Sequence, residues 1–301
     1  MNSTLQQMAT KFFWAGYRAP MTGKTTNPQA FPSGVPRVAA QPPELRPATI
    51  RLLVIPVTVY TAWLLEIFLL EGSLDLFRRF DPPLLFLYTL IACILTGIIV
   101  PLLCIRTAFV SGTVNLFQIG FRSLRRTMTA CTLTGIICYG AVIFLNPFGT
   151  DRFAFVHAFL FLLPGAIASV MICWVLAGTH VQAFVREGGM VISISVGIMV
   201  TALLFGMTTF AHFPAALNQD IFFSLVSIGI IAAVFFFAVR DVYSTSLVVG
   251  VCSVFAMSDR ISPQYLQETV YIWINAIIAI GVLAGIHLYL SRNYVTLEIP
   301  R

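Results

Sequence analysis

Apolar residues in this chain are gathered into long runs, and polar residues are concentrated in the short segments between them. The runs are continuous rather than alternating, which is typical of membrane helices and not of the strands of a membrane barrel. Each approaches the roughly 20 residues that a helix needs to cross a bilayer. The pattern predicts an all-α polytopic membrane protein with about eight transmembrane helices. The predicted spans cover about 50–70, 83–105, 129–147, 153–179, 189–211, 220–239, 242–258 and 269–291, and the short sequence RDV predicts a tight turn after the sixth.

The composition agrees with a membrane location. Hydrophobic residues make up 58% of the 301 residues and charged residues only 10%, with a mean hydropathy of +0.89. A soluble domain carries about 25% charged residues. The net charge of +6 does not indicate a nucleic-acid partner, because the basic residues lie between the apolar runs, where they set the orientation of the spans. The predicted partner is the lipid bilayer.

The distribution of Lys and Arg predicts how the spans are oriented. If the N-terminus is inside, all but four of the 18 Lys and Arg residues fall in cytoplasmic segments. The four exceptions are Arg78, Arg79, Arg152 and Arg260. Positive charge collects on the cytoplasmic side of membrane proteins, so the count predicts a multi-pass protein of the cell membrane with both termini cytoplasmic.

The segments outside the spans predict three accessory regions. Residues 1–48 contain six prolines between 27 and 48 and lack the apolar core of a signal peptide, so we expect a cytoplasmic Pro-rich tether ahead of the membrane domain at 49–291. Residues 107–128 are too polar to span. Their large apolar residues repeat at helical spacing beside three arginines, which predicts an amphipathic helix in the cytoplasmic interface, near anionic lipid. Residues 292–301 are the expected cytoplasmic tail.

Ionisable side chains inside a span are costly and are therefore candidates for function. Glu66 lies one turn from the outer end of the first span, and Glu71 follows just beyond it. A carboxylate at that depth can also reach the interface or stay protonated. His157 and His287 lie within spans, and His180 closes the fourth. Such a histidine is either a hydrogen-bonded structural residue or a ligand, and the sequence leaves both open.

The sequence predicts no metal site and no cofactor. No two histidines stand three or four residues apart and no H-E-x-x-H motif is present, so the spacing of a zinc site is missing. The six cysteines form no C-x-x-C pair and are expected to be packing residues. The G-x-S-x-G motif, the P-loop and an Asp-rich diphosphate motif are also missing from the sequence.

One polar cluster ends the fifth predicted span. The sequence LLFGMTTFAHF, from Leu203 to Phe213, places Gly206, Thr208, Thr209 and His212 among apolar residues. Threonines in a membrane helix commonly bond to a carbonyl one turn earlier, and glycine lets a neighbouring helix come close. The cluster predicts either a close helix crossing capped by an interfacial histidine, or the remnant of a functional site.

The second interpretation depends on the segments around this cluster, between about 153 and 258. In order they read ICWVLAG (Ile172–Gly178), THVQAFVREGG, TALLFGMTTFAHF and GIIAAVFFFAVRDVYSTSLVVG. This succession resembles the CAAX protease and bacteriocin-processing family of glutamate-dependent intramembrane proteases. That family has an EExxxRG helix, a basic turn, a helix with FxxxH and a helix with a last histidine. The resemblance implies a protease-like helical core over about a third of the chain.

The departures from the family remove its catalytic groups. A hydrolase of this kind needs a glutamate to activate water and histidines to polarise it. The positions that lack those groups are Ile172 and Cys173 for the two glutamates, Ala177 for the arginine, Thr209 for the FxxxH histidine and Val254 for the last histidine. The resemblance therefore implies the fold without an intact catalytic set. His212 could replace a lost histidine, and Glu66 could supply a base from another helix.

These observations lead to four hypotheses of function. The first is a catalytically inactive protein with the family's core, which binds a lipid, a lipidated peptide or another membrane protein in the former active site. The second is a small-solute transporter or channel, with Glu66, His157 and His212 along its path. The third is a structural subunit of a membrane complex. An active intramembrane peptidase that uses Glu66 and His212 is the least favoured, because the sequence lacks the family's paired glutamates.

Overall fold

The structure is a computed structural model that describes residues 45–110, 119–145, 152–185, 188–214, 219–257, 260–267 and 269–293. The chain divides into two units between Pro47 and Ala48. The helices that are long enough to span a membrane belong to the second unit. Every regular element among the described residues is a helix, which confirms the predicted all-α class. The tether predicted at 1–48 and the tail predicted at 292–301 lie almost entirely outside the described residues.

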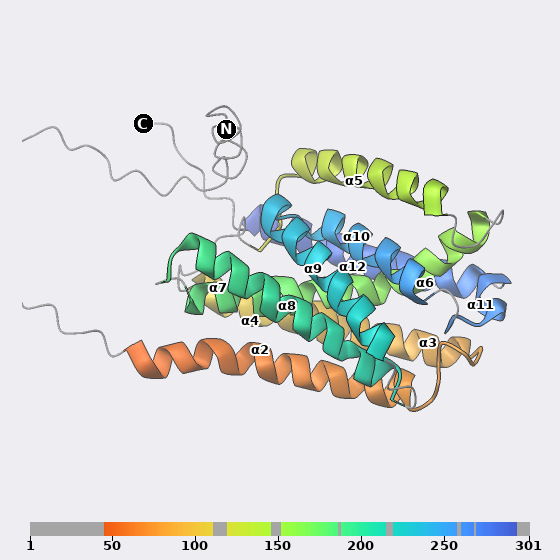
Figure 1. The fold of residues 1–301 in the computed structure, drawn as a ribbon, viewed down its shortest axis with the longest axis horizontal. Helices are drawn as coiled ribbons and strands as arrows, with labels where there is room; N and C mark the ends of the chain where they lie inside the picture. The colour runs from red at the N-terminus through yellow and green to blue at the C-terminus, as the bar shows by residue number, and fades with distance from the viewer. Residues whose placement is uncertain are drawn as a thin grey trace, which may run out of the picture. The chain divides into compact units, whose positions relative to one another are not determined.

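The helices follow one another through short connections (Figure 1). Three of the long helices contain a π-helical stretch, labelled η, in which each residue bonds to the fifth residue before it. In chain order the elements are α2 (Leu45–Ile67), η1 (Phe68–Gly72), α3 (Pro82–Tyr88), η2 (Thr89–Ile99), α4 (Val100–Val110), α5 (Leu124–Leu145), α6 (Arg152–Ser169), η3 (Val170–Gly178), α7 (Thr179–Phe184), α8 (Met190–His212), α9 (Gln219–Val239), α10 (Val242–Met257), α11 (Pro263–Gln267) and α12 (Thr269–Asn293).

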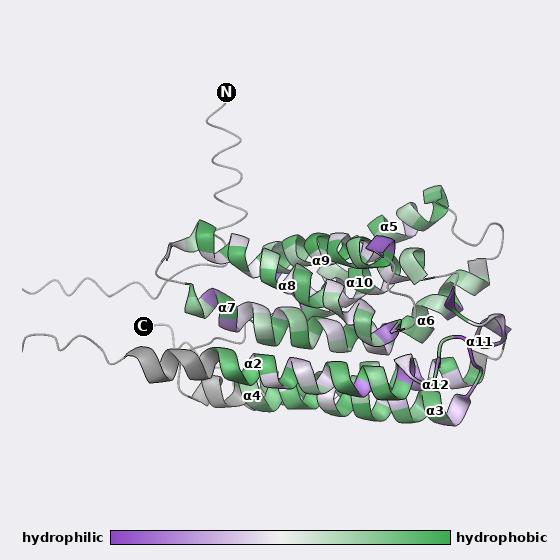
Figure 2. Cartoon of the chain, turned by 60° about the horizontal axis from the view of Figure 1, so that its bottom comes forward, coloured by the Kyte–Doolittle hydropathy of each residue, from purple (hydrophilic) through white to green (hydrophobic). Residues whose placement is uncertain are grey.

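Seven helices among the described residues are long and apolar enough to cross a membrane. They cover Leu53–Gly72, Pro82–Ile105, Leu124–Leu145, Phe153–Phe184, Met190–His212, Gln219–Val239 and Val270–Leu290. Hydrophobic residues cover the helices along most of their length, and hydrophilic residues gather near the helix ends (Figure 2). The fold is therefore that of a multi-pass helical membrane protein.

The predicted seventh span, at 242–258, is shorter than the others. It corresponds to α10, an apolar helix of 16 residues. At 1.5 Å per residue such a helix is about 24 Å long, against roughly 30 Å of hydrocarbon. The tight turn predicted before it is present, and Arg240 accommodates this turn with a positive φ of 54°.

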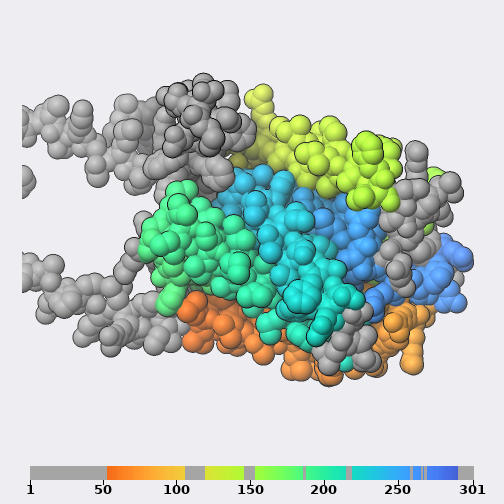
Figure 3. Space-filling view, viewed as in Figure 1, coloured from red at the N-terminus to blue at the C-terminus, as the bar shows by residue number. Residues whose placement is uncertain are grey.

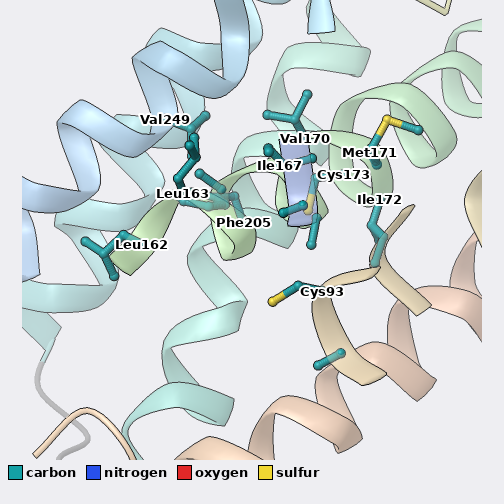
Figure 4. Close-up of a cluster of buried hydrophobic side chains, with 14 of the residues drawn as sticks. Cys93, Leu162, Leu163, Ile167, Val170, Met171, Ile172, Cys173, Phe205 and Val249 are labelled. Atoms are coloured by element: carbon teal, nitrogen blue, oxygen red, sulfur yellow. The ribbon is translucent and has the colours of Figure 1, made fainter. Parts of the chain in front are cut away.

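One continuous helix, α6–η3–α7, forms the centre of the bundle. It contacts α8, α10, α12 and η2, and every residue from Val170 to Gly178 is buried. A helix that is apolar on all sides is stable only where neighbours cover it completely. Cys93 from η2, Phe205 from α8 and Val249 from α10 lie around this helix in the apolar cluster of Figure 4.

α5 is the outlying helix. Its principal packing partner among the described elements is α10, and it lies along one edge of the face shown in Figures 1 and 3. Ile137, Phe144 and Leu145 on this helix are exposed. In a bilayer these side chains meet lipid, which is as apolar as they are.

The predicted interfacial helix at 107–128 lies partly outside the described residues. In the described part, α4 continues to Val110, Ile119–Ser123 are non-helical, and α5 begins at Leu124. Arg125 and Arg126 therefore belong to the first turn of α5. They are exposed there and do not form a separate surface helix.

The crossing of η2 and α6 yields a test of the packing. A Cβ on Gly97 would lie 2.4 Å from Cβ of Ala168 and 2.8 Å from the carbonyl oxygen of Ala92. Overpacking typically costs about 1–3 kcal/mol, so we expect Gly97→Ala to lower the unfolding temperature in detergent. Gly140→Ala on α5 is the control, because a Cβ there meets nothing within 4 Å. Equal unfolding temperatures for the two variants would contradict this helix crossing.

Candidate functional site

The first feature of the site is a contact between η1 and the end of α8. A Cβ on Gly72 would lie only 1.9 Å from the carbonyl oxygen of Ala211, so the two backbones meet at a position that only glycine can occupy. This contact brings Glu71 and His212 together, with 2.5 Å between Oε1 of Glu71 and Nδ1 of His212. The Glu71 side chain is 1% exposed and the His212 side chain 14%.

Glu71 continues the buried face of the helix that begins as α2. Tyr60, Trp63 and Ile67 are buried at spacings of three and four residues, and Glu71 follows four residues later as the buried residue of η1, which covers Phe68–Gly72. Residues at these spacings share one face of a helix. Glu71 is therefore directed into the protein, at the end of a helix where the sequence alone predicted an interfacial position for it.

A cavity lies beside the Glu71–His212 pair. It contains about 520 Å³ of empty space including its open mouth. Its wall is aromatic and aliphatic with a few polar groups, the usual make-up of a ligand site. The lining residues are Trp63, Phe77, Tyr88, Phe161, Leu162, Gly165, Ala166, Ser169, Phe205, Thr208, His212, Leu225, Val249, Ser253 and Met257.

Several polar groups of this wall are already paired. Ser169 donates to the carbonyl oxygen of Gly165 at 2.8 Å, and Thr208 donates to that of Phe205 at 2.6 Å. Tyr88 interacts electrostatically with Glu71, which stands behind His212 and does not itself line the cavity.

Other polar groups of the site have no partner among the residues that the structure describes. They are the fully buried Nε1 of Trp63, together with Nε2 of His212 and the hydroxyl of Ser253. Buried polar groups are almost always hydrogen-bonded, and an unpaired one costs free energy. Because His212 and Ser253 line the cavity, their unpaired groups point to a ligand or ordered water.

The loop that carries Phe77 is held in place from α11. Ser262 N–H donates to the carbonyl oxygen of Phe77 at 2.8 Å. The Tyr265 hydroxyl donates to Arg79 O and accepts from Asp81 N–H, each at 3.0 Å. Burial raises the pKa of Tyr265 above its usual value, so this hydroxyl stays protonated and keeps its donor.

Different residues of the Gly-Thr-Thr-His cluster fit the two interpretations, a helix crossing and part of a site. A Cβ on Gly206 would lie 2.3 Å from Cγ2 of Val226, and Thr209 donates to Gly206 O at 2.7 Å. Gly206 therefore serves the crossing of α8 and α9, and the Thr209 hydroxyl is bonded within its own helix. Thr208 and His212 line the cavity instead, so one segment contributes to both.

The positions of the family's catalytic residues lie in solid packing rather than at the cavity. Ile172, Cys173, Ala177 and Val254 are buried core residues, and Figure 4 shows Ile172 and Cys173 within the central apolar cluster. None of these residues, nor Thr209, lines the cavity. Of the candidate residues that the sequence singled out, His212 lines the cavity, and so does Ser253, which lies between Cys252 and Val254.

Glu66 does not pair with His212. It accepts a hydrogen bond of 2.9 Å from Oγ1 of Thr96 and does not line the cavity. The carboxylate that meets His212 is Glu71, which sequence analysis noted only as a neighbour of Glu66. Hydropathy could not find this pair, because the two residues are 141 positions apart and meet only through the contact of η1 with the end of α8.

The other histidines differ in their surroundings. His180 is buried with Nδ1 2.7 Å from Leu176 O, and His287 has Nε2 2.7 Å from Arg122 O and Nδ1 3.2 Å from the Tyr243 hydroxyl. Both are hydrogen-bonded structural residues. His157 is half-buried and is not a lining residue of the cavity.

A second polar cluster, at the turn between α9 and α10, was not predicted. Asp241 is fully buried and accepts from Thr127 Oγ1 at 2.7 Å and from Ser244 N–H at 2.8 Å. Arg240 donates to Gln182 Oε1 at 2.7 Å, and its carbonyl accepts from Arg122 Nε at 2.9 Å.

Within this second cluster, charge and burial shift the pKa of Arg122 in opposite directions. Burial lowers the pKa of Arg122, and the nearby Asp241 carboxylate opposes that shift. The hydrogen bonds of the cluster join α5, α7, α9 and α10. We regard it as a structural tie, since its polar groups bond to one another.

Metal ligation and the comparisons add no further assignment. No group of three or more His, Cys, Asp or Glu residues that could hold a metal occurs in the described part of the chain. Comparison with protein families, curated proteins and solved structures found no match. The resemblance to the CAAX protease family therefore rests on the sequence segments alone.

The tie at Asp241 yields a test. Thr127→Val keeps the shape of the side chain and removes a donor to a buried carboxylate, a loss of roughly 1.5–3 kcal/mol. We expect a lower unfolding temperature in detergent. Thr129→Val is the matched control, because that exposed hydroxyl donates only to Arg125 O within its own helix. If both variants unfold like the wild type, the Thr127–Asp241 bond does not stabilise the fold.

Proposed function

We propose that this protein binds a membrane-soluble ligand within the bilayer. The cavity beside Glu71 and His212 would take the apolar part of a lipid or of a lipidated peptide, and the polar groups of its wall would hold the ligand's polar end. The observation that carries the proposal is an aromatic-walled cavity that lies against a buried carboxylate–histidine pair. Ionisable residues inside membranes are expensive and commonly mark functional sites.

Binding rather than proteolysis is part of the proposal. We infer that the CAAX-protease-like core, which rests on its resemblance in sequence, is catalytically inactive, because Ile172 and Cys173 stand at the positions of the family's glutamates. Ile172 and Cys173 are fully buried and offer no base to a water molecule. The carboxylate next to the cavity, Glu71, is paired with His212 behind the wall.

The cavity can be tested by filling it. Gly165 lines the cavity, and a Cβ there meets only the Tyr88 hydroxyl, at 3.7 Å. We expect a fluorescent prenylated peptide to bind saturably to the purified protein, and Gly165→Leu to weaken this binding at least 10-fold (about 1.4 kcal/mol). Gly140→Leu, at an open position of α5, should bind like the wild type.

The same experiment tests the absence of proteolysis. The peptide should remain intact in the presence of the wild-type protein, and Glu66→Gln should change nothing. Cleavage that Glu71→Gln or Glu66→Gln abolishes would overturn the binding proposal in favour of a hydrolase. Equal affinity of wild type and Gly165→Leu would place the ligand outside this cavity.

We also propose a cell-membrane location with both termini in the cytoplasm, on the basis of the Lys and Arg distribution. Green fluorescent protein fluoresces when it folds in the cytoplasm, so we expect fluorescence from a fusion after Arg301. A fusion truncated after Arg260, in a predicted outer segment, should be dark. The reverse result would invert the topology.

A further inference from the structure

The contact with Glu71 determines which nitrogen of His212 is open to a ligand. Nδ1 of His212 lies 2.5 Å from Oε1 of Glu71 and is occupied by that bond. Nε2 has no partner among the residues that the structure describes, and His212 lines the cavity. The bond to Glu71 therefore leaves Nε2 for a ligand, to which an imidazole N–H donates a hydrogen bond.

Ser253 supplies a second donor to the same cavity. It lies on α10, whereas His212 ends α8, and both line the cavity. The Ser253 hydroxyl forms no hydrogen bond with any residue that the structure describes. The indole N–H of Trp63 is also unpaired among those residues, but it is fully buried and is not counted as a donor to a ligand. The unpaired groups of His212 and Ser253 can therefore both donate.

The charge of the cavity restricts the ligand further. Neither Lys, Arg, Asp nor Glu occurs among the described residues that line it, and the Glu71 carboxyl behind it is bonded to His212. An anionic head group would find no fixed cation, and a cationic one would find no free carboxylate. Burying an uncompensated charge is strongly unfavourable, so an uncharged acceptor fits this wall.

We propose that the polar end of the ligand is the carbonyl oxygen of an uncharged ester or amide, which accepts hydrogen bonds from Ser253 and from Nε2 of His212. This inference rests on the proposed function and names its ligand class. Acylated lipids and lipidated peptides carry such a carbonyl next to an apolar chain. Glu71 is a positioning residue, since it acts on the ligand only through His212.

The head group is tested with four probes of similar chain length: methyl laurate, tridecane, laurate and dodecylamine. Binding is followed by intrinsic fluorescence in detergent, because Trp63 lines the cavity; Trp63→Phe checks that the signal comes from there. We expect methyl laurate to bind about 10-fold more tightly than tridecane, as two hydrogen bonds of modest net strength predict. Laurate and dodecylamine should bind more weakly than the ester.

Matched serine variants test the contact itself. Ser253→Ala should lower the affinity for methyl laurate about 3- to 5-fold and leave that for tridecane unchanged. Ser246→Ala is the control: Ser246 lies on the same helix as Ser253, its hydroxyl donates to Val242 O, and it does not line the cavity. It should bind both probes like the wild type.

The outcomes separate this inference from the proposed function. Equal affinity for methyl laurate and tridecane, or tightest binding of laurate or dodecylamine, overturns the carbonyl assignment and leaves binding in the cavity intact. The same loss in both serine variants also overturns it, because packing alone would then explain the effect. If neither these probes nor the prenylated peptide bind saturably, the proposed function itself is wrong.

Discussion

The hydrocarbon of a bilayer offers no water to an unpaired polar group, so a membrane protein must satisfy each one internally. Here the backbone does so with helices, and the buried charges do so in two places. Glu71 meets His212 at one end of α8, and Asp241 accepts from Thr127 and Ser244 at the far end of α9. These contacts require η1 to meet the end of α8, and the α9–α10 turn to meet the start of α5.

The central helix α6–η3–α7 is tightly packed along one part of its length and borders the cavity along another. Along η3 the residues from Val170 to Gly178 are completely enclosed, whereas Gly165 and Ser169 on the preceding turns of α6 border the cavity. Large side chains fill the first region, and small ones leave room in the second. The cavity therefore lies next to Glu71 and His212, and none of the positions that resemble the protease motif lines it.

Backbone geometry sets the chemistry of this cavity. The η1 stretch buries Glu71, and the Gly72–Ala211 contact brings the end of α8 against it. The pair then fixes which nitrogen of His212 remains for a ligand. A single carboxylate can thus control the hydrogen bonding of a site that it does not line.

The sequence by itself determined the helical class, the spans and their approximate ends, because hydrophobic length and continuity depend only on the order of residues. It also singled out His212 and the small residues around it. Tertiary structure alone decided that Glu71 and not Glu66 meets His212, that Ser253 joins them, and that Asp241 is buried. The Glu71–His212 contact joins residues 141 positions apart, and it depends on the close approach of Gly72 to the backbone of Ala211, which leaves no periodic signal in the sequence.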